Sequence, residues 1–501
     1  MEERKNKIIH LAIIVLGIVF ISIGAFHQNL WFDETYSVAL AKHSFADIWR
    51  IGGNDVHPIL YYMFLKIINI LSGGSIIAYR LFSALAISIL GILGFTHIRK
   101  DFGSKIGILF TFFTFFLPVI TPYASEIRMY SWAALFVTLT AIYGYRLTKK
   151  SNIKNWILFG LFSILSLYTH YYGVMAAGLI NIAVLIYFIR RSEKQNIIKF
   201  LVTGIAQVIL YAPWLYCFII QLTNVSKGFW ITLSFPGTLF EIMDFQCLGN
   251  LDERVAIVLS FALFIIGFFV MNSLKTDKKT KNKINIKSLF KNTTGKEFDP
   301  GKQAIILYFG VIIAAAILSI KTPILYPRYL FVITGLLIFF WSYFISKCNS
   351  KKILGTIIVF VVLVSIYSNV KFIRTNYDNS NMTQIEYIKN NLKSEDVIIF
   401  NNPELGSGSV IDVNIDGNIT YFYDSENWNV EKAYEAYAPD MKIIHNLDEL
   451  TNFKGRIWII DSNDNSLYNE ISEKFSIEEI ERKTINTKYK GYNFNFILVN
   501  K

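Results

Sequence analysis

Long apolar runs separated by short polar loops make up most of the chain up to about residue 370. A helix needs roughly 20 apolar residues to cross the hydrocarbon layer of a membrane. Eleven runs of this kind begin near Ile8, Ile76, Lys105, Met129, Asn155, Gly173, Asn196, Val255, Gln303, Leu330 and Ile353. The pattern therefore predicts an α-helical polytopic membrane protein with about eleven transmembrane helices, all within a module of residues 1–370.

From residue 371 the pattern changes, and short apolar runs alternate with helix-like stretches. Residues 397–400 and 457–460 have the composition of buried strands, and residues 430–437 have a helix-like pattern. The length of this part is typical of one domain. We expect residues 371–501 to form a small C-terminal α/β domain. They contain no glycine-rich fingerprint and no nucleophile elbow, so the sequence assigns this domain no chemistry.

The composition of the 501 residues agrees with a membrane location. The chain is 53% hydrophobic and 17% charged, and its mean hydropathy is +0.40. In soluble domains about a quarter of the residues are charged. This argues against a soluble enzyme, a disordered scaffold and a nucleic-acid-binding protein. Cys217, Cys247 and Cys348 are too few and too dispersed for a disulfide framework or a metal cluster.

The net charge of +12 is distributed unevenly. Residues 371–501 have 14 Lys and Arg against 21 Asp and Glu, a net charge of −7, and the remainder carries +19. The basic residues of the remainder lie in short loops, as they do in polytopic membrane proteins with cytoplasmic basic loops. Residues 1–7 carry three basic residues and no small-residue cleavage site follows the first apolar run, so we expect that run to stay as a membrane span.

One segment decides the topology. Residues 58–74 are apolar but short, with Lys66 in the middle. If this segment spans the membrane, every later basic loop moves to the outside. If it lies at the interface, the basic loops all face the cytoplasm, including the lysine-rich loop 275–302. The positive-inside rule favours the second arrangement. It predicts a cytoplasmic N-terminus, an extracytoplasmic first loop (residues 27–75) and an extracytoplasmic C-terminal domain.

With this topology, ionisable and polar side chains gather at the outer ends of the spans. The set is Asp33, Glu34, Asp55 and His57 in the first loop, Arg80 in the second span, Glu126 and Arg128 before the fourth, His170 and Tyr171 after the fifth, and Arg328 before the tenth. Ionisable groups at membrane depth are costly and usually line a cavity, a pathway or a reaction site.

Each of these residues also has a purely structural interpretation. Asp33 could cap the helix that follows it, and Arg80 could extend to lipid headgroups. Glu126 and Arg128 could pair and only close a loop, and His170 could belong to an interfacial aromatic belt. These interpretations do not explain why acidic, basic and histidine side chains converge on one face.

Six motifs, in their order along the chain, resemble those of the GT-C polyprenyl-phosphate-sugar glycosyltransferases. They are WFDE (31–34), D-x-HP-x-LYY (55–62), YRLFSAL (79–85), YASEIRMYS (123–131), THYYG (169–173) and PRYL (327–330). The family 39 type, which includes protein O-mannosyltransferases and lipid A aminoarabinose transferases, is the most similar. The resemblance covers residues 8–340, and the chain departs from it at Ile59, where these proteins usually have a second proline.

The resemblance implies a polyprenyl-phosphate-linked sugar as donor and Asp33 as the catalytic base, with Glu34 as the next candidate. A positioned carboxylate suits the base of an inverting sugar transfer. Arg80, Arg128 and Arg328 are candidates to hold the donor phosphate, because guanidinium groups bind phosphate oxygens bidentately. Asp55, His57, Glu126, His170 and Tyr171 are further candidates for binding the substrates. There is no Asp-x-Asp pair and no His/Cys ligand spacing, so we expect no essential metal or other cofactor.

Two other functions stay open at this point. A transporter or flippase of lipid-linked saccharides would also be polytopic, but transporters commonly contain internal repeats and polar residues at the bilayer midplane. A sensor with a functional C-terminal domain would need only one membrane anchor. The sequence favours the enzyme over both, and it leaves open the sugar and whether the acceptor is a glycan, a lipid or a protein.

Overall fold

The computed structural model describes residues 2–227, 237–248, 299–348, 350–402, 417–425, 431–437, 441–461, 463–487 and 493–501, with a few single residues between these ranges. The span that we expected near Val255 and almost all of loop 275–302 lie outside the described residues. The fold class is confirmed for the described chain: it is a mostly helical, multi-pass membrane protein with a small C-terminal α/β domain.

Ten expected spans coincide with described helices. These are α1 (Glu2–Ser22), α5 (Ile76–Leu93), α7 (Ser104–Phe116), α9 (Tyr130–Lys149), α10 (Ile153–Thr169), α11 (Tyr171–Arg190), α12 (Lys194–Lys227), α16 (Pro300–Leu318), α17 (Thr334–Ser346) and α18 (Lys351–Asn376). Seven of the described helical segments are long and apolar enough to cross a membrane. α7 and α10 are apolar but shorter, and α7 is followed by the short helix α8 (Ile120–Ser125).

Small residues let neighbouring helices of the bundle approach closely. α5 continues through η2 (Gly94–Ile98) into α6 (Arg99–Phe102). A Cβ on Gly94 would lie 2.8 Å from the carbonyl oxygen of Gly107 in α7, so neither α5–η2 nor α7 could keep its place with a larger residue there. Close backbone contact at small residues is how helices associate in lipid, where burial of apolar surface gives no driving force.

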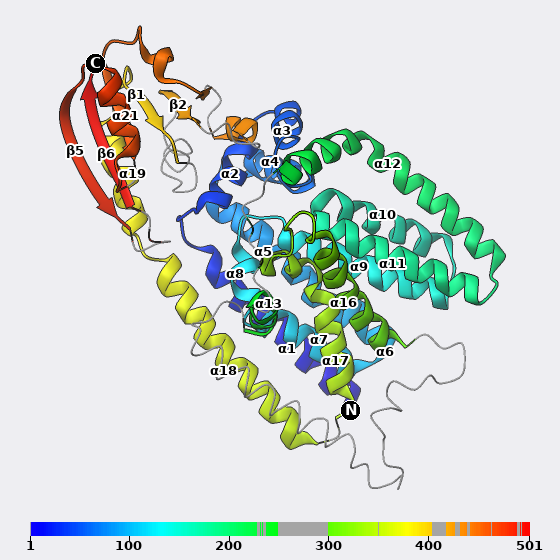
Figure 1. Cartoon of the computed structure of the whole chain (residues 1–501). Helices are drawn as coiled ribbons and strands as arrows, with labels where there is room; N and C mark the ends of the chain where they lie inside the picture. Colours follow the sequence, from blue (N-terminus) through cyan, green and yellow to red (C-terminus); the bar gives the residue numbers. More distant parts are fainter. Residues whose placement is uncertain are drawn as a thin grey trace.

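The first loop forms three short helices instead of a span. They are α2 (Phe32–Lys42), α3 (Phe45–Gly52) and α4 (Leu60–Ser72). α4 is the segment expected at the interface, and its 13 residues extend for about 20 Å, less than the hydrocarbon thickness. The three helices lie at the end of the bundle beside the C-terminal domain, and the N-terminus of the chain lies at the other end (Figure 1).

The C-terminal domain contains a six-stranded mixed sheet. Its strands are β1 (Val397–Phe400), β2 (Ile419–Tyr423), β3 (Lys442–Ile444), β4 (Arg456–Asp461), β5 (Glu478–Asn486) and β6 (Asn493–Asn500), in the order β3-β2-β1-β4-β6-β5. β1 pairs in parallel with β2 and β4, and β6 is antiparallel to β4 and β5. β1 and β4 are the strands expected from the sequence.

Both faces of the central strands β1 and β4 are buried, which explains their uninterrupted apolar runs. Ile399 and Ile459 belong to one apolar cluster, and Phe400 and Trp458 belong to the other. The domain also contains α19 (Ser380–Asn391), η4 (Glu431–Ala436), η5 (Leu447–Leu450) and α21 (Ser466–Lys474). α18 runs through residue 371 to Asn376, so the division of the chain at residue 370 stays a prediction.

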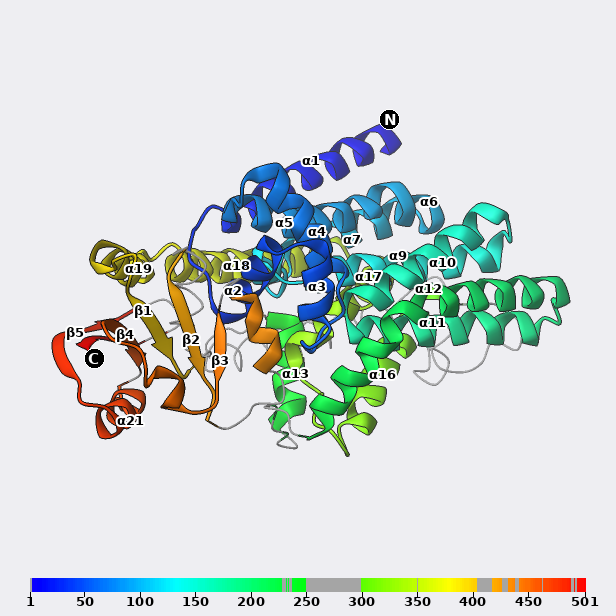
Figure 2. The same cartoon turned by 90° about the horizontal axis from the view of Figure 1, so that it is seen from above.

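The contacts that join the C-terminal domain to the first loop include two polar ones at η4. The Arg50 guanidinium pairs with Glu435 at 2.7 Å, and the His43 ring nitrogen is 3.0 Å from the carbonyl oxygen of Ala436. η4 (Glu431–Ala436) contacts α2 and α3, and the view from above shows the β3 edge of the sheet on the side of α2 (Figure 2). The end of the bundle that carries the candidate residues is therefore covered in part by this domain.

Candidate functional site

The candidate residues come from six separate segments that converge at this end of the bundle. α2 carries Asp33 and Glu34, and the turn after α3 carries Asp55 and His57. α5 carries Arg80, and the turn between α8 and α9 carries Glu126 and Arg128. His170 and Tyr171 lie at the junction of α10 and α11, and Arg328 lies in η3 (Pro327–Ile333). The predicted convergence of these side chains is present, with the exceptions described below.

Asp33 lies between two arginines. Its carboxylate is 2.9 Å from a terminal nitrogen of Arg328 and 4.0 Å from Nε of Arg128. The Arg128 and Arg328 side chains are 5% and 14% exposed, and the Asp33 side chain is 22% exposed. Trp31 is the N-cap residue of α2, so Asp33 does not have the capping role that the sequence left open. A partly accessible carboxylate beside two buried cations can meet both an acceptor and an anionic donor.

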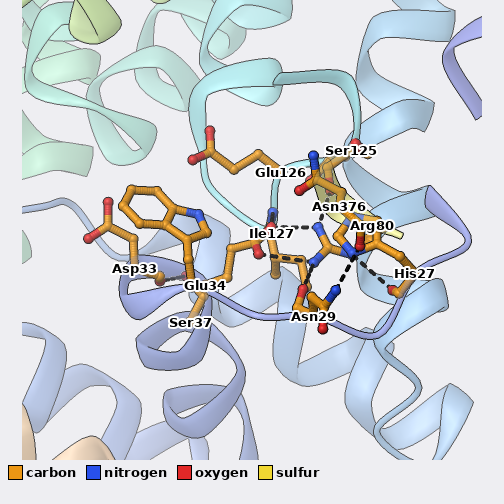
Figure 3. Close-up of polar contacts among 12 residues, drawn as sticks. His27, Asn29, Asp33, Glu34, Ser37, Arg80, Ser125, Glu126, Ile127 and Asn376 are labelled. Atoms are coloured by element: carbon orange, nitrogen blue, oxygen red, sulfur yellow. Dashed lines mark hydrogen bonds and ion pairs between the residues drawn. The ribbon is translucent and has the colours of Figure 1, made fainter. Parts of the chain in front are cut away.

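Glu34 faces a different partner, because successive residues of a helix point about 100° apart. Its carboxylate accepts two hydrogen bonds from Arg80, at 2.5 and 3.0 Å, and one from the backbone N–H of Ile127 at 3.0 Å. Arg80 also donates to the carbonyl oxygens of His27, Asn29 and Ser125. Figure 3 shows this network, with Asp33 and Glu126 pointing away from it on the other side of the loop.

This network leaves no donor of Arg80 free for a phosphate. Arg80 is only 1% exposed, and its three guanidinium nitrogens all have partners. The structure therefore places Arg80 and Glu34 in a buried ion pair that joins α2, α5 and the turn after α8. We interpret both as positioning residues, and the assignment of Arg80 to the donor phosphate loses its geometric support.

Arg128 and Arg328 differ from Arg80 in their partners. Arg128 donates to the hydroxyl of Tyr62 at 3.2 Å and to the backbone oxygen of Asp33, but its buried Nε has no hydrogen-bond partner among the described residues. Arg328 lies over the rings of Trp31 and Tyr130, at 4.7 and 5.2 Å. Cations held by aromatic faces keep N–H donors available in the plane of the guanidinium.

Glu126 shares one nitrogen of Arg328 with Asp33. The distance from Arg328 Nη2 to Glu126 is 3.1 Å, and that to Asp33 is 2.9 Å. Burial raises the pKa of Glu126 to about 7, with the nearby Glu34 and Asp33 carboxylates adding to the effect of burial and Arg328 opposing it. Glu126 pairs with Arg328, and the loop-closing pair with Arg128 that the sequence left open is not among the described ion pairs.

Asp55 is linked to the same arginines through Tyr62. The Tyr62 hydroxyl donates to Asp55 at 3.3 Å and accepts from Arg128 at 3.2 Å. Burial raises the pKa of Asp55 to about 6, against the opposing charge of Arg128. Tyr62 was not among the candidate residues taken from the sequence. Its position in the D-x-HP-x-LYY motif, seven residues after Asp55, was the signal that connects it with the site.

His57 and His170 face one another, with their ring centroids 5.4 Å apart. His170 Nδ1 accepts the backbone N–H of Tyr172 at 3.0 Å and so caps α11. Its Nε2 is buried and has no hydrogen-bond partner among the described residues. Burial, reinforced by Arg128 and Arg328, lowers the pKa of His170 to about 3, so the ring is neutral and Nε2 carries the proton.

Tyr171 does not join the cluster. Its hydroxyl donates to Gln221 of α12, and Gln221 in turn donates to the backbone oxygens of Gly52 and His57. Tyr171 therefore holds α12 against the first loop. The aromatic residues that do line the cluster are Tyr130 and Tyr329, whose ring centroids lie 5.4 and 5.3 Å from that of His170. Neither was among the candidates taken from the sequence, although each lies inside a motif that contains a candidate arginine, YASEIRMYS (123–131) and PRYL (327–330).

The described residues contain no group of three or more His, Cys, Asp or Glu side chains that could hold a metal ion. Positive charge at the cluster is supplied by the side chains of Arg128 and Arg328.

Residues 56–217 match the family model of dolichyl-phosphate-mannose-protein mannosyltransferases. Among curated proteins, no sequence matches the chain. The matched segment includes His57, Glu126, Arg128 and His170.

The solved structures that resemble the chain include two of ArnT from Cupriavidus metallidurans. The alignment with the apo crystal structure has 10% sequence identity and a TM-score of 0.61, and it covers 98% of this chain and 97% of ArnT. The structure of ArnT bound to undecaprenyl phosphate is 11% identical, with a TM-score of 0.60, and covers 99% and 98%. The chain has the ArnT fold from end to end. The resemblance to the GT-C glycosyltransferases is confirmed.

Proposed function

We propose that the protein transfers a sugar from a polyprenyl-phosphate donor to an acceptor on the extracytoplasmic face, with inversion at the anomeric carbon. The observation that carries this proposal is the partly exposed Asp33 carboxylate held between Arg328 and Arg128. The fold of ArnT, which has been solved with undecaprenyl phosphate, supports the donor class. The acceptor is a glycan, a lipid or a protein.

In the proposed reaction, Asp33 accepts the proton of an acceptor hydroxyl or amine. The lone pair of that atom forms the new bond to the anomeric carbon, while the bond from this carbon to the phosphate oxygen breaks and polyprenyl phosphate leaves. A single displacement of this kind inverts the anomeric centre. Arg128 and Arg328 offset the charge that develops on the leaving phosphate, and their fixed, buried positions avoid reorganisation during the reaction.

The buried pair of Glu34 and Arg80 has a supporting role in this proposal. It ties the start of α2 to the turn that carries Glu126 and Arg128, through the bonds from Arg80 to Ser125 and from Ile127 to Glu34. Catalytic groups must be held within a fraction of an ångström of their working geometry. Asp33 and Arg128 would therefore lose their relative placement without this pair.

The proposal is tested by replacing Asp33 with asparagine. Asn keeps the shape but does not accept a proton at neutral pH, so we expect Asp33→Asn to abolish transfer while the purified protein still binds undecaprenyl phosphate. The assay follows release of undecaprenyl phosphate from labelled sugar donors in nanodiscs. Asp47→Asn is the matched control, because Asp47 lies in the same loop on the exposed start of α3. Activity of Asp33→Asn within a few-fold of wild type would remove Asp33 from the role of base.

A lipid-linked saccharide flippase is the second candidate, because it would bind the same lipid. The location of the ionisable cluster at one end of the bundle disfavours it, since transporters place their sites near the midplane. Saturable movement of the intact lipid-linked sugar across liposomes, without release of undecaprenyl phosphate, would favour the flippase.

A further inference from the structure

The C-terminal domain meets the first loop at a set of aromatic rings, which we call the aromatic seam: Phe32, Tyr36, Tyr62, Tyr434 and Tyr437. Phe32 lies 6.4 Å from Tyr434 and 6.1 Å from Tyr437, measured between ring centroids. Tyr437 meets Tyr36 edge-on at 6.0 Å, and Tyr36 meets Tyr62 edge-on at 5.7 Å. The seam therefore runs without a break from the C-terminal domain to the Tyr62 hydroxyl between Arg128 and Asp55.

Two hydroxyl groups of the aromatic seam are buried without hydrogen bonds. Tyr36 is 5% exposed and Tyr437 is 2% exposed. Neither hydroxyl has a hydrogen-bond partner among the described residues. Buried polar groups are almost always satisfied by protein, water or ligand, and leaving one unsatisfied is costly. The two rings meet edge-on, and their hydroxyls leave hydrogen-bonding capacity for another polar molecule.

This place is continuous with the reaction site. Tyr36 follows Asp33 by three residues on α2, so the two side chains lie on neighbouring positions of one helix face. Burial raises the pKa of Tyr437 well above its ordinary value, and Tyr434, Asp33 and Asp55 reinforce this effect. The hydroxyl of Tyr437 is therefore protonated at neutral pH and close enough to both carboxylates to respond to their charges.

We propose that Tyr437, supplied by the C-terminal domain, completes the substrate site together with Tyr36, and that the two hydroxyls bind hydroxyl groups of the transferred sugar. The proposal rests on the proposed function of the site. It makes the C-terminal domain part of the binding site, although no motif in its sequence assigns it any chemistry.

The chemistry of the aromatic seam fits a sugar better than the other parts of the two substrates. A phosphate would select the guanidinium groups of Arg128 and Arg328, and a polyprenyl chain would select an entirely apolar surface. Rings that carry hydroxyls offer both an apolar face for sugar C–H groups and directed hydrogen bonds for sugar O–H groups. Water alone could also satisfy the two hydroxyls, and the experiment below separates these cases.

The test compares a lipid with and without its sugar. Undecaprenyl phosphate, and undecaprenyl phosphate carrying mannose, glucose, galactose or arabinose, are titrated against the purified full-length protein in nanodiscs. Tyr437→Phe removes one hydroxyl and keeps the ring that packs on Phe32 and Tyr36. The comparison uses the sugar-bearing lipid that wild type binds most tightly. We expect Tyr437→Phe to bind this lipid about three- to tenfold more weakly, the usual effect of one lost hydrogen bond. Affinity for bare undecaprenyl phosphate should not change, and Tyr36→Phe should behave in the same way.

Tyr387→Phe is the matched control. Tyr387 lies on α19 of the same domain, and its hydroxyl donates to Glu481 at 2.6 Å, away from the aromatic seam. Wild-type sugar discrimination in Tyr437→Phe would overturn the proposal. An equal loss of affinity for both lipids would overturn it as well, because it would show a structural role. If wild type itself binds bare and sugar-bearing lipids equally and releases no undecaprenyl phosphate, the proposed function fails first, and this result is distinct from the other two.

Discussion

At the scale of single residues, the three arginines have different surroundings, although the sequence treats them alike. Arg80 has a partner at each of its nitrogens, whereas Arg128 keeps a buried Nε without a hydrogen-bond partner among the described residues. Arg328 binds Asp33 and Glu126 through one nitrogen. These differences predict different consequences for the same substitution.

We expect Arg128→Lys and Arg328→Lys to slow transfer without unfolding the protein. Lys keeps the charge but loses the planar fork that binds a phosphate bidentately. The expected loss of transition-state stabilisation is about 2–4 kcal/mol, by analogy with a removed oxyanion donor. This corresponds to a fall in rate of roughly thirty- to thousand-fold. The measurement is turnover of a labelled donor at matched amounts of folded protein, and near-wild-type rates would contradict the role of both residues at the phosphate.

Arg80→Lys should instead destabilise the fold. The buried carbonyl oxygens of His27, Asn29 and Ser125 would lose hydrogen-bond donors. Each oxygen left unsatisfied lowers the free energy of unfolding by about 1–3 kcal/mol. We expect a lower melting temperature in detergent, less folded protein and slower transfer, because the placement of Asp33 relative to Arg128 depends on the ion pair of Arg80. A stable but inactive Arg80→Lys protein would return Arg80 to the phosphate site.

Glu126 gives the stability of the protein a pH dependence. Burial raises its pKa from 4.5 to about 7, so the protonated form is favoured in the folded state. Its contribution to stability is complete below the ordinary pKa and is lost as the pH rises through about 7. We expect the melting temperature to fall as the pH rises from about 4.5 to about 7 and to level off above that. Glu126→Gln should flatten part of this change, and Asp55, with a pKa of about 6, should account for the remainder.

At the scale of elements, the junction of α10 and α11 combines a helix cap with a candidate binding group on one side chain. His170 Nδ1 caps α11, and its ring packs against those of His57, Tyr130 and Tyr329, with Nε2 buried. These two functions can be separated, because Asn also caps a helix but does not extend to where Nε2 lies.

We expect His170→Ala to lose both the cap and the Nε2 group, with a decrease in stability of about 1 kcal/mol. His170→Asn should recover most of the stability but not the activity. Thermal unfolding and donor turnover are measured for both variants. If His170→Asn recovers both, the cap alone explains the residue, and Nε2 has no part in binding substrate.

At the scale of the whole molecule, the orientation in the membrane is the prediction on which the extracytoplasmic site depends. The short α4 is compatible with an interfacial position. We expect loops that contain Arg99, Lys149 and Arg190 to be cytoplasmic and the C-terminal domain to be outside. Ser407, which we also expect outside, lies beyond the described residues.

The test uses an impermeant maleimide on intact cells, after Cys217, Cys247 and Cys348 have been replaced. A cysteine at Asn463, which is exposed in the C-terminal domain, should be labelled. A cysteine at Ser151, in the loop between α9 and α10, should be labelled only after the cells are permeabilised. Labelling of the cysteine at position 151 on intact cells would mean that α4 spans the membrane, and the predicted outer site would be lost.

The spans, the two central strands and the pool of candidate residues followed from local sequence. Partition into lipid depends on the composition of about 20 consecutive residues, and strand burial shows in runs such as Val397–Phe400. None of these properties depends on distant segments. For that reason the fold class agrees with the expectation, and ten of the expected spans coincide with described helices.

The pairing of charges depended on tertiary structure. Asp33 and Glu34 are adjacent in sequence, yet one binds Arg328 and the other binds Arg80, because α2 turns their side chains toward different segments. In the same way, Tyr437 reaches the site only because the C-terminal domain folds back onto α2. Ion-pair partners and aromatic contacts are set by the packing of segments hundreds of residues apart, and a local pattern carries no information about that packing.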